Sequence, residues 1–305
     1  MRVPDILRKL SSAIRRTGIV PGRDKIMNVK IDYLQDEVSQ LRMLMRHLVA
    51  AQNLELPHIS QTKGSFDYQW REIPEGESML SSETWRAGVV DTITRLSGRP
   101  RDWFPGKRVM DAGCGQGRWT YGFGKLGVRS CVSCDQSAGG ISRTREIAAE
   151  FGSNFQVDQR NLLEDLDYDA GFDLVWCFGV LHHTGDTYKS LQNLVKCVKP
   201  GGYLFLMIYG EPRPDHIEDY LYYHEMFEMR CRLRNLQFDE KVKVLREKYG
   251  KDQMHGYFDA ISPDINDLYR WDELESWLIN AGFEDIQRTY PEHPNHHFVA
   301  RKRAP

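Results

Sequence analysis

The segment 109–120 combines a carboxylate with three glycines at alternate positions and reads Val-Met-Asp-Ala-Gly-Cys-Gly-Gln-Gly-Arg-Trp-Thr. Gly113, Gly115 and Gly117 have no Cβ atoms, so the chain can turn sharply out of a strand and bring its amides against a ligand at a helix N-terminus. Asp111 lies two residues before the first glycine, and an anion at this place suits a cationic ligand. The pattern predicts a loop that binds a nucleotide-like molecule.

A second carboxylate, Asp135, lies 18 residues after Gly117 and ends the apolar stretch 130–134. An acid at the tip of a second strand can accept hydrogen bonds from both hydroxyls of a ribose. The glycine spacing G-x-G-x-G differs from the G-x-G-x-x-G fingerprint of dinucleotide-binding proteins. An ordinary strand-to-helix turn beside a solvated aspartate is the alternative interpretation, and the position of Asp135 argues against it.

Residues 107–209 resemble the core of the class I S-adenosylmethionine-dependent methyltransferases. The segments that match the family's motifs, in the expected order, are 111–117, 135–136, 172–183 and 199–207. The resemblance implies an α/β fold, a doubly wound, mostly parallel seven-stranded sheet of the Rossmann-like methyltransferase type. It also implies that the cofactor is S-adenosyl-L-methionine.

The resemblance further implies where that cofactor binds. The glycines would pack on the methionine and ribose portions, Asp111 would sit near the methionine amino end through backbone or water, and Asp135 would hold the ribose. The family usually has an aspartate for the adenine amino group where this chain has Asn161, whose amide oxygen can still accept that hydrogen bond. The implied cofactor-binding residues are Asp111, Ala112, Gly113, Gly115, Gly117, Asp135, Gln136, Asn161, Leu162, Phe178 and Gly179.

Two adjacent histidines, His182 and His183, follow the fourth expected strand, at the methyl edge of the cofactor by family analogy. If the methyl acceptor is a hydroxyl, a general base with a pKa near neutrality helps to remove its proton, and one of the two is our candidate. The alternative is a loop histidine hydrogen-bonded to the backbone. We expect no metal site, because Cys131 and Cys134 have no second cysteine pair at ligand spacing and resemble two buried thiols.

Aromatic and polar residues outside the core offer surfaces for an acceptor. Aromatic residues occupy the alternate positions 66, 68 and 70. This spacing predicts that they share one face, which either lines a substrate entrance or packs under a sheet. A polar, tyrosine-rich insertion at about 211–266 follows the fifth strand and is expected to hang over the site as a cap. The candidate substrate residues are Phe66, Tyr68, Trp70, Tyr209, Arg213, His216 and Tyr223.

The elements that must position these residues alternate between strands and helices, which indicates a doubly wound sheet. We expect strands at 108–112, 130–135, 154–157, 172–178, 202–209, 283–290 and 297–301, and helices near 117–126, 138–151, 186–198 and 271–281. A helix capped at Ser82 and running through Leu96 is typical of one that closes over the cofactor in this family. We divide the chain into an N-terminal part (1–56), a linker with this covering helix (57–100) and a methyltransferase domain (101–305).

The N-terminal part carries two patterns. Residues 1–25 form a basic amphipathic arm with seven lysines or arginines, which suits contact with the inner face of a membrane or simply a solvated face. Residues 27–48 form a heptad seam, which packs either on the catalytic domain or in a homo-oligomeric coiled coil. The seam residues are Met27, Ile31, Leu34, Val38, Leu41, Met45 and Leu48.

Bulk composition is that of a globular enzyme, with 305 residues, 28% charged residues and a net charge of −2. The chain shows neither a bilayer-spanning apolar run nor a signal peptide, so we expect a cytoplasmic protein, held peripherally at a membrane if the arm binds lipid. The leading hypothesis is methyl transfer to a hydroxyl of a sugar, glycan or other small metabolite. Alkyl transfer to a transfer RNA wobble uridine is one alternative, although the charge argues against a nucleic-acid partner; a non-catalytic cofactor-binding scaffold is the other.

Overall fold

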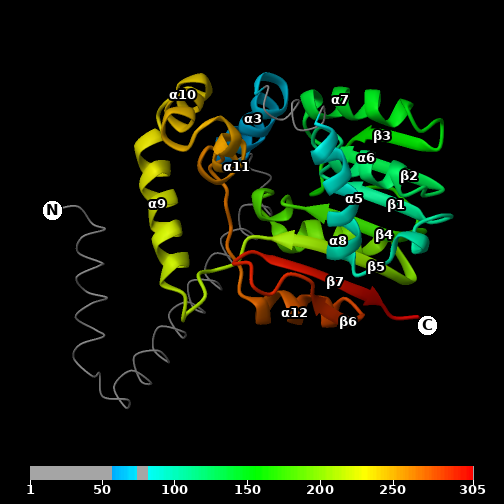
Figure 1. Cartoon of the computed structure of the whole chain (residues 1–305). Helices are drawn as coiled ribbons and strands as arrows, with labels where there is room; N and C mark the ends of the chain where they lie inside the picture. Colours follow the sequence, from blue (N-terminus) through cyan, green and yellow to red (C-terminus); the bar gives the residue numbers. More distant parts are fainter. Residues whose placement is uncertain (1–56, 74–81, 305) are drawn as a thin grey trace, which may run out of the picture. The chain divides into compact units, whose positions relative to one another are not determined.

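The computed structural model describes residues 57–73 and 82–304, which form an α/β unit around one seven-stranded sheet (Figure 1). The strands are β1 (Arg108–Ala112), β2 (Ser130–Asp135), β3 (Phe155–Gln159), β4 (Phe172–Phe178), β5 (Val198–Ile208), β6 (Phe283–Arg288) and β7 (His296–Lys302). Their order in the sheet is β3-β2-β1-β4-β5-β7-β6, and only β7 runs antiparallel to both of its neighbours. The expected basic arm (1–25) and heptad seam (27–48) lie outside the described residues.

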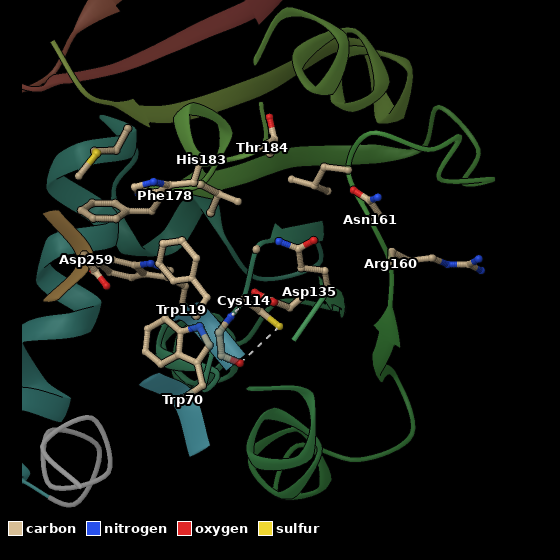
Figure 2. A pocket seen from close by; sticks show the side chains of 18 of the residues that line it. Trp70, Cys114, Trp119, Asp135, Arg160, Asn161, Phe178, His183, Thr184 and Asp259 are labelled. Carbon is tan, nitrogen blue, oxygen red and sulfur yellow. Dashed lines mark hydrogen bonds between the residues drawn. The ribbon is translucent and has the colours of Figure 1, made fainter. Parts of the chain in front are cut away.

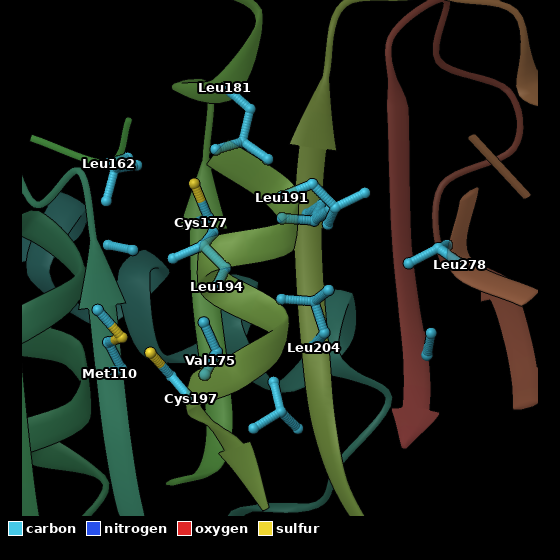
Figure 3. Close-up of a cluster of buried hydrophobic side chains, with 14 of the residues drawn as sticks. Met110, Leu162, Val175, Cys177, Leu181, Leu191, Leu194, Cys197, Leu204 and Leu278 are labelled. Atoms are coloured by element: carbon cyan, nitrogen blue, oxygen red, sulfur yellow. The ribbon is translucent and has the colours of Figure 1, made fainter. Parts of the chain in front are cut away.

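Helices cover both faces of this sheet. They are α5 (Glu83–Ser97), α6 (Arg118–Lys125), α7 (Ala138–Ala149), α8 (Thr187–Cys197) and α12 (Trp271–Asn280). One core cluster joins α8 and α12 to the sheet, and Figure 3 shows Leu194 of α8 beside Val175 and Cys177 of β4. A second cluster joins α5 and α6 to the opposite face, where Trp176 stacks on Phe205 with ring centroids 3.8 Å apart.

The core strands and helices form where the alternation of apolar segments predicts them, and the seven-stranded, mostly parallel sheet is confirmed. The first six residues of β4 are all buried, as expected for a central parallel strand that packs helices on both faces. Cys131 and Cys134 are both buried, and they belong to clusters on opposite faces of the sheet. These two thiols therefore cannot point into a common site.

The segment expected to be a linker is instead a helix, α3 (Pro57–Glu72). Because a helix turns about 100° per residue, Phe66 and Trp70 share a face while Tyr68 points away from them. The Tyr68 ring packs on Phe238 and Phe258, with centroids 5.3 and 6.1 Å apart. The prediction that all three aromatics share one face was therefore wrong, since period two fits a strand and not a helix.

The insertion between β5 and α12 forms three helices, α9 (Ile217–Leu233), α10 (Phe238–Tyr249) and α11 (Lys251–Ile261). They enclose a core of their own, to which α3 contributes Tyr68. Polar contacts also join α3 to the insertion: Ser65 Oγ donates to Ser262 Oγ at 2.8 Å, and Gln61 Nε2 donates to the Ser262 carbonyl at 2.8 Å. Helix α3 is thus part of the same structural unit as the insertion.

In the part of the chain that the structure describes, no helix has both the length and the apolar content needed to cross a bilayer.

Candidate active site

A pocket lies at the carboxyl ends of the parallel strands, where the strand order reverses between β1 and β4 (Figure 2). Loops that follow β1, β2, β3 and β4 form its floor and sides, and α3 and α11 add residues from outside the sheet. Ligands of doubly wound sheets bind at this kind of crevice, because the loops on either side of the reversal diverge.

The glycine loop after β1 can approach a ligand closely because side chains would not fit there. Gly113 has a φ of +77°, and a Cβ atom on it would lie 2.3 Å from Cγ2 of Val180. Gly115 has a φ of +50°, and a Cβ on it would lie 2.9 Å from the Trp70 ring. Both line the pocket, whereas Gly117 stands at the N-cap of α6 and is turned toward α7, where its Cβ would meet Ile147 and Thr144.

Asp135 ties the glycine loop to the end of β2. Its Oδ2 accepts a hydrogen bond from the Gly115 amide at 2.9 Å, and its Oδ1 accepts one from the Ser137 amide at 2.8 Å. Burial raises the pKa of Asp135, and the backbone hydrogen bonds oppose that rise. Asp135 and Gln136 both line the pocket, so a carboxylate with free lone pairs faces the place where a ribose is expected.

Asn161 and Leu162 line the pocket after β3, on the side away from α3 (Figure 2). The Asn161 side chain is fixed within its own turn, because Oδ1 accepts from the Leu163 amide at 3.1 Å and Nδ2 donates to Glu164 at 3.3 Å. The amide oxygen keeps a second lone pair for an adenine amino group. Arg160, which the sequence did not single out, lines the same side.

Asp111 and Ala112 do not line the pocket, because β1 buries both beneath the glycine loop. Oδ2 of Asp111 accepts a hydrogen bond from Thr120 Oγ1 at 2.7 Å, while Oδ1 has no hydrogen-bond partner. Burial raises the pKa of Asp111 to about 7. The side chain holds α6 against β1. The expectation that Asp111 lies near the methionine amino end through backbone or water stays a prediction.

Of the two candidate bases, only His183 lines the pocket. Its Nδ1 lies 2.8 Å from the Ile265 carbonyl, so Nδ1 carries the proton and Nε2 keeps a lone pair. Burial lowers the pKa of His183 to about 4. His182 is fully buried behind it, stacked on Tyr209 at 3.8 Å, and its Nδ1 accepts from the Tyr209 amide at 3.3 Å. His182 therefore packs behind the pocket wall and does not line the pocket.

The predicted substrate residues divide into two groups. Phe66, Trp70 and Tyr209 line the pocket beside Phe178 and Gly179. Tyr68, Arg213, His216 and Tyr223 do not line it.

The residues of the second group lie within the insertion core or at the edge of the insertion. Tyr68 belongs to the insertion core, and Arg213 pairs with the nearly buried Asp219 at 2.7 Å. His216 precedes α9, and the Tyr223 hydroxyl donates to the Gly210 carbonyl at 2.6 Å. Tyr68, Arg213 and Tyr223 therefore make contacts within the insertion or at its edge, whereas His216 is exposed.

The helix that covers the pocket is α3, not α5. Helix α5 forms where it was expected, but it packs on α6 and the sheet and supplies no lining residue. Instead Ile59, Phe66 and Trp70 of α3 lie over the pocket, and Gln116 of the glycine loop donates its side-chain amide to the Trp70 carbonyl.

Besides Arg160, two further charged residues in the pocket wall were missed, Arg118 at the start of α6 and Asp259 on α11. Trp119 stands beside Asp259 in Figure 2 and lines the pocket with it. Arg118 directly follows the last glycine of the loop, so its place could have been inferred from the motif. Asp259 had no such signal, because only the folding of the insertion back over the sheet brings it here.

The arrangement suits a ligand with a nucleoside at one end and a charged amino-acid-like chain at the other. Acceptor groups lie along the side formed by Asp135 and Asn161, glycine backbone lies in the centre, and aromatic rings with Asp259 and His183 close the far end. The aromatic rings of this wall are half-buried apart from the buried Trp119, so they reduce the access of water to this end of the pocket.

Comparison with known families gives one match over most of the chain. A family model described as "Methyltransferase domain" matches residues 83–288.

Individual relatives match shorter parts. An uncharacterised protein from Synechococcus is 26% identical over 210 residues, 61% of this chain and 50% of that protein. A ubiquinone biosynthesis O-methyltransferase from Erwinia tasmaniensis is 30% identical over 44% of this chain and 58% of that protein. A transfer RNA U34 carboxymethyltransferase from Campylobacter hominis is 28% identical over 33% of this chain and 35% of that protein. The chain thus spans about half or less of these curated relatives.

Solved structures include the YcgJ protein from Bacillus subtilis, with a TM-score of 0.48 and 14% identity, covering 72% of this chain and all of that one. Magnesium protoporphyrin IX methyltransferase from Synechocystis, solved with bound S-adenosylhomocysteine, has a TM-score of 0.46 and 16% identity, covering 71% of this chain and 83% of that one.

Proposed function

The chain belongs to the class I S-adenosylmethionine-dependent methyltransferases, with S-adenosylmethionine as its cofactor, and we propose that it methylates a hydroxyl of a small, ring-containing metabolite such as a sugar or a phenol. The observation that carries the proposal is the far end of the pocket. The pocket is lined there by the aromatic rings of Phe66, Trp70 and Trp119 and by two groups that can take a proton, His183 and Asp259.

This end of the pocket suits a compact, uncharged acceptor. Aromatic faces stack on phenol rings and on the apolar faces of sugars. The methyl group of a sulfonium is already electrophilic, so holding the acceptor oxygen in line and excluding water supply much of the rate enhancement. A hydroxyl must in addition lose its proton, which needs a base close to the acceptor.

Two matched relatives support oxygen as the acceptor atom. One is the ubiquinone biosynthesis O-methyltransferase already described, and the other is a 27-O-demethylrifamycin SV methyltransferase from Amycolatopsis mediterranei, 31% identical over 39% of this chain. Both names describe transfer to an oxygen of a small molecule, and we extend that chemistry to this chain as part of the proposal.

The test is methyl transfer from isotopically labelled S-adenosylmethionine to panels of monosaccharides and phenols, with mass spectrometry of the labelled product. Label on an oxygen of one of these acceptors would support the proposal, and label on nitrogen or carbon would refute it. Total transfer RNA is included in the panel because of the carboxymethyltransferase relative. Label confined to RNA would replace a metabolite with a nucleic-acid substrate.

A further inference from the structure

We propose that Thr62 of α3 positions His183 for the methyl acceptor, by fixing the backbone carbonyl that holds the His183 ring. The link between the two side chains is the backbone of Ile265, in the connecting segment (262–267) that lies between α11 and α12. The inference rests on the proposed hydroxyl acceptor, because His183 Nε2 would accept the hydrogen bond of that hydroxyl. It gives a helix outside the sheet a role in the reaction.

The His183 ring has one nitrogen that the protein holds and one that is open to the pocket. Nδ1 lies 2.8 Å from the Ile265 carbonyl oxygen, which can only accept, so Nδ1 carries the proton. Nε2 has no hydrogen-bond partner in the described part of the chain, yet it is not enclosed by protein, unlike Nε2 of the fully buried His182. Burial lowers the pKa of His183 to about 4, so the ring is neutral at pH 7. Since His183 lines the pocket, a donor that enters the pocket can use the lone pair of Nε2.

The backbone of Ile265 is held on both sides. Its amide donates to Thr62 Oγ1 at 3.0 Å, and its carbonyl accepts from His183. Thr62 and His183 are only 1% and 6% exposed, so water has little access to either side chain. Ile265 also packs closely on the loop after the histidines, where a Cβ on Gly185 would lie 3.3 Å from its Cδ1. Loss of the Thr62 hydroxyl would leave a buried amide without an acceptor, which is costly, so Ile265 would move and take its carbonyl with it.

Helix α3 also touches the His183 ring directly. Phe66 follows Thr62 by four residues and therefore lies on the same face of the helix. Its ring meets His183 edge-on, with centroids 4.8 Å apart and an angle of 62° between the ring planes. The aromatic contact limits the tilt of the ring, and the Ile265 carbonyl limits its rotation. Both restraints on the direction of Nε2 thus depend on α3.

Ser65 offers a matched contrast on the same helix. Its Oγ donates to Ser262 Oγ at 2.8 Å, in a buried bond between α3 and the same connecting segment. Loss of that bond would loosen α3 without removing a partner of Ile265. Substitutions of Thr62 and Ser65 therefore separate a specific effect on the His183 ring from a general loosening of α3.

A fixed Nε2 serves methyl transfer by orienting the acceptor oxygen. A hydroxyl that donates to Nε2 keeps its lone pairs for the sulfonium methyl group, and the hydrogen bond sets their direction. Attack on that carbon is an in-line displacement, so a misplaced oxygen lowers the rate. Thr62 is thus a positioning residue, which acts on the acceptor through Ile265 and His183.

The first measurement is the tautomer of His183 in the ligand-free, full-length protein at pH 7, by nitrogen-15 NMR of histidine-labelled samples. His183→Gln identifies the signals by their loss. The wild type is expected to be protonated on Nδ1 and unprotonated on Nε2. One hydrogen bond changes an equilibrium about fivefold, so in Thr62→Val the ratio of this tautomer to the other should fall about fivefold. Thr62→Ser, which keeps the hydroxyl, and Ser65→Ala should both keep the wild-type ratio.

The second measurement asks whether Thr62 acts through His183. With an acceptor identified from the monosaccharides and phenols, Thr62→Val should lower kcat/KM for that acceptor about fivefold. The Kd for S-adenosylhomocysteine should change less than about twofold, because the cofactor loops keep their own hydrogen bonds. In a His183→Ala background, Thr62→Val should change kcat/KM by less than about twofold, since the nitrogen that it positions is gone.

A wild-type ring protonated on Nε2 would overturn the inference without any variant, and so would a wild-type ratio in folded Thr62→Val. Should Thr62→Val not fold, Thr62→Ala takes its place, because it removes the same hydroxyl. An equal change in Ser65→Ala, or equal losses of kcat/KM with and without His183, would make Thr62 a structural residue only. Label on nitrogen or carbon of the acceptor would refute the proposed function and leave the tautomer result standing, so the two failures are distinguishable.

Discussion

Replacing Asp135 with asparagine tests whether its carboxylate sets the shape of the cofactor loop. The side chain accepts hydrogen bonds from the Gly115 and Ser137 amides at 2.9 and 2.8 Å. An asparagine offers only one oxygen, so one buried amide would face an NH2 group. A hydrogen bond to a charged group contributes about 1.5–3 kcal/mol. At about 1.4 kcal/mol per factor of ten, Asp135→Asn should weaken S-adenosylhomocysteine binding about 10- to 150-fold.

Isothermal titration calorimetry gives the Kd, and circular dichroism shows whether the variant is folded. Ser137→Ala is the matched control, because it removes the hydroxyl that caps α7 through the Gly140 amide and leaves the Asp135 carboxylate in place. That control should cost about 1 kcal/mol of stability with little change in Kd. A Kd for folded Asp135→Asn within twofold of wild type would refute the assignment of Asp135 to the cofactor site.

Three further predictions follow from the geometry. His183→Ala should lower kcat less than tenfold at saturating cofactor, because a histidine with a pKa near 4 serves as a hydrogen-bond partner; a 100-fold loss in steady-state assays would make it the base instead. Phe258→Ala, in the core of the insertion, should lower the free energy of unfolding by about 3–5 kcal/mol in urea titrations, and a loss below about 1 kcal/mol would contradict its packing. The stability of the ligand-free protein should fall as pH rises from about 4 to about 7, because the folded state holds protons on Asp111 and Asp259 that the unfolded state releases. The melting temperature, measured as a function of pH, should fall over this range in the wild type and fall less steeply in Asp111→Asn. Equal slopes in the two proteins would mean that groups other than Asp111 cause the pH dependence.

The sheet could be predicted from the sequence because its signals are local. Apolar strands end in glycines or acids at regular intervals, and this regular spacing predicted all seven strands to within a few residues. The places of Gly113, Gly115 and Asp135 in the pocket follow from the same logic, since the carboxyl ends of parallel strands meet at one edge.

The outer wall of the pocket could not be predicted in the same way. Helix α3 is fixed by contacts with residues some 200 positions later, such as Ser65 with Ser262. Its aromatic spacing alone favoured a strand, and tertiary packing overrode that preference. Asp259 reaches the pocket through the same long-range packing. Contacts between residues so far apart in the sequence cannot be inferred from the spacing of residues along the chain.

The position of α3 affects where a recombinant fragment of this protein should begin and which residues a sequence comparison should include. The conserved-domain match begins at residue 83, yet Ile59, Phe66 and Trp70 lie upstream of that boundary and close one side of the cavity. A recombinant fragment that begins at residue 83 and keeps the C-terminal residues would retain the whole sheet and still present its ligand to bulk solvent. Searches confined to the matched region would likewise leave these three residues out of the comparison.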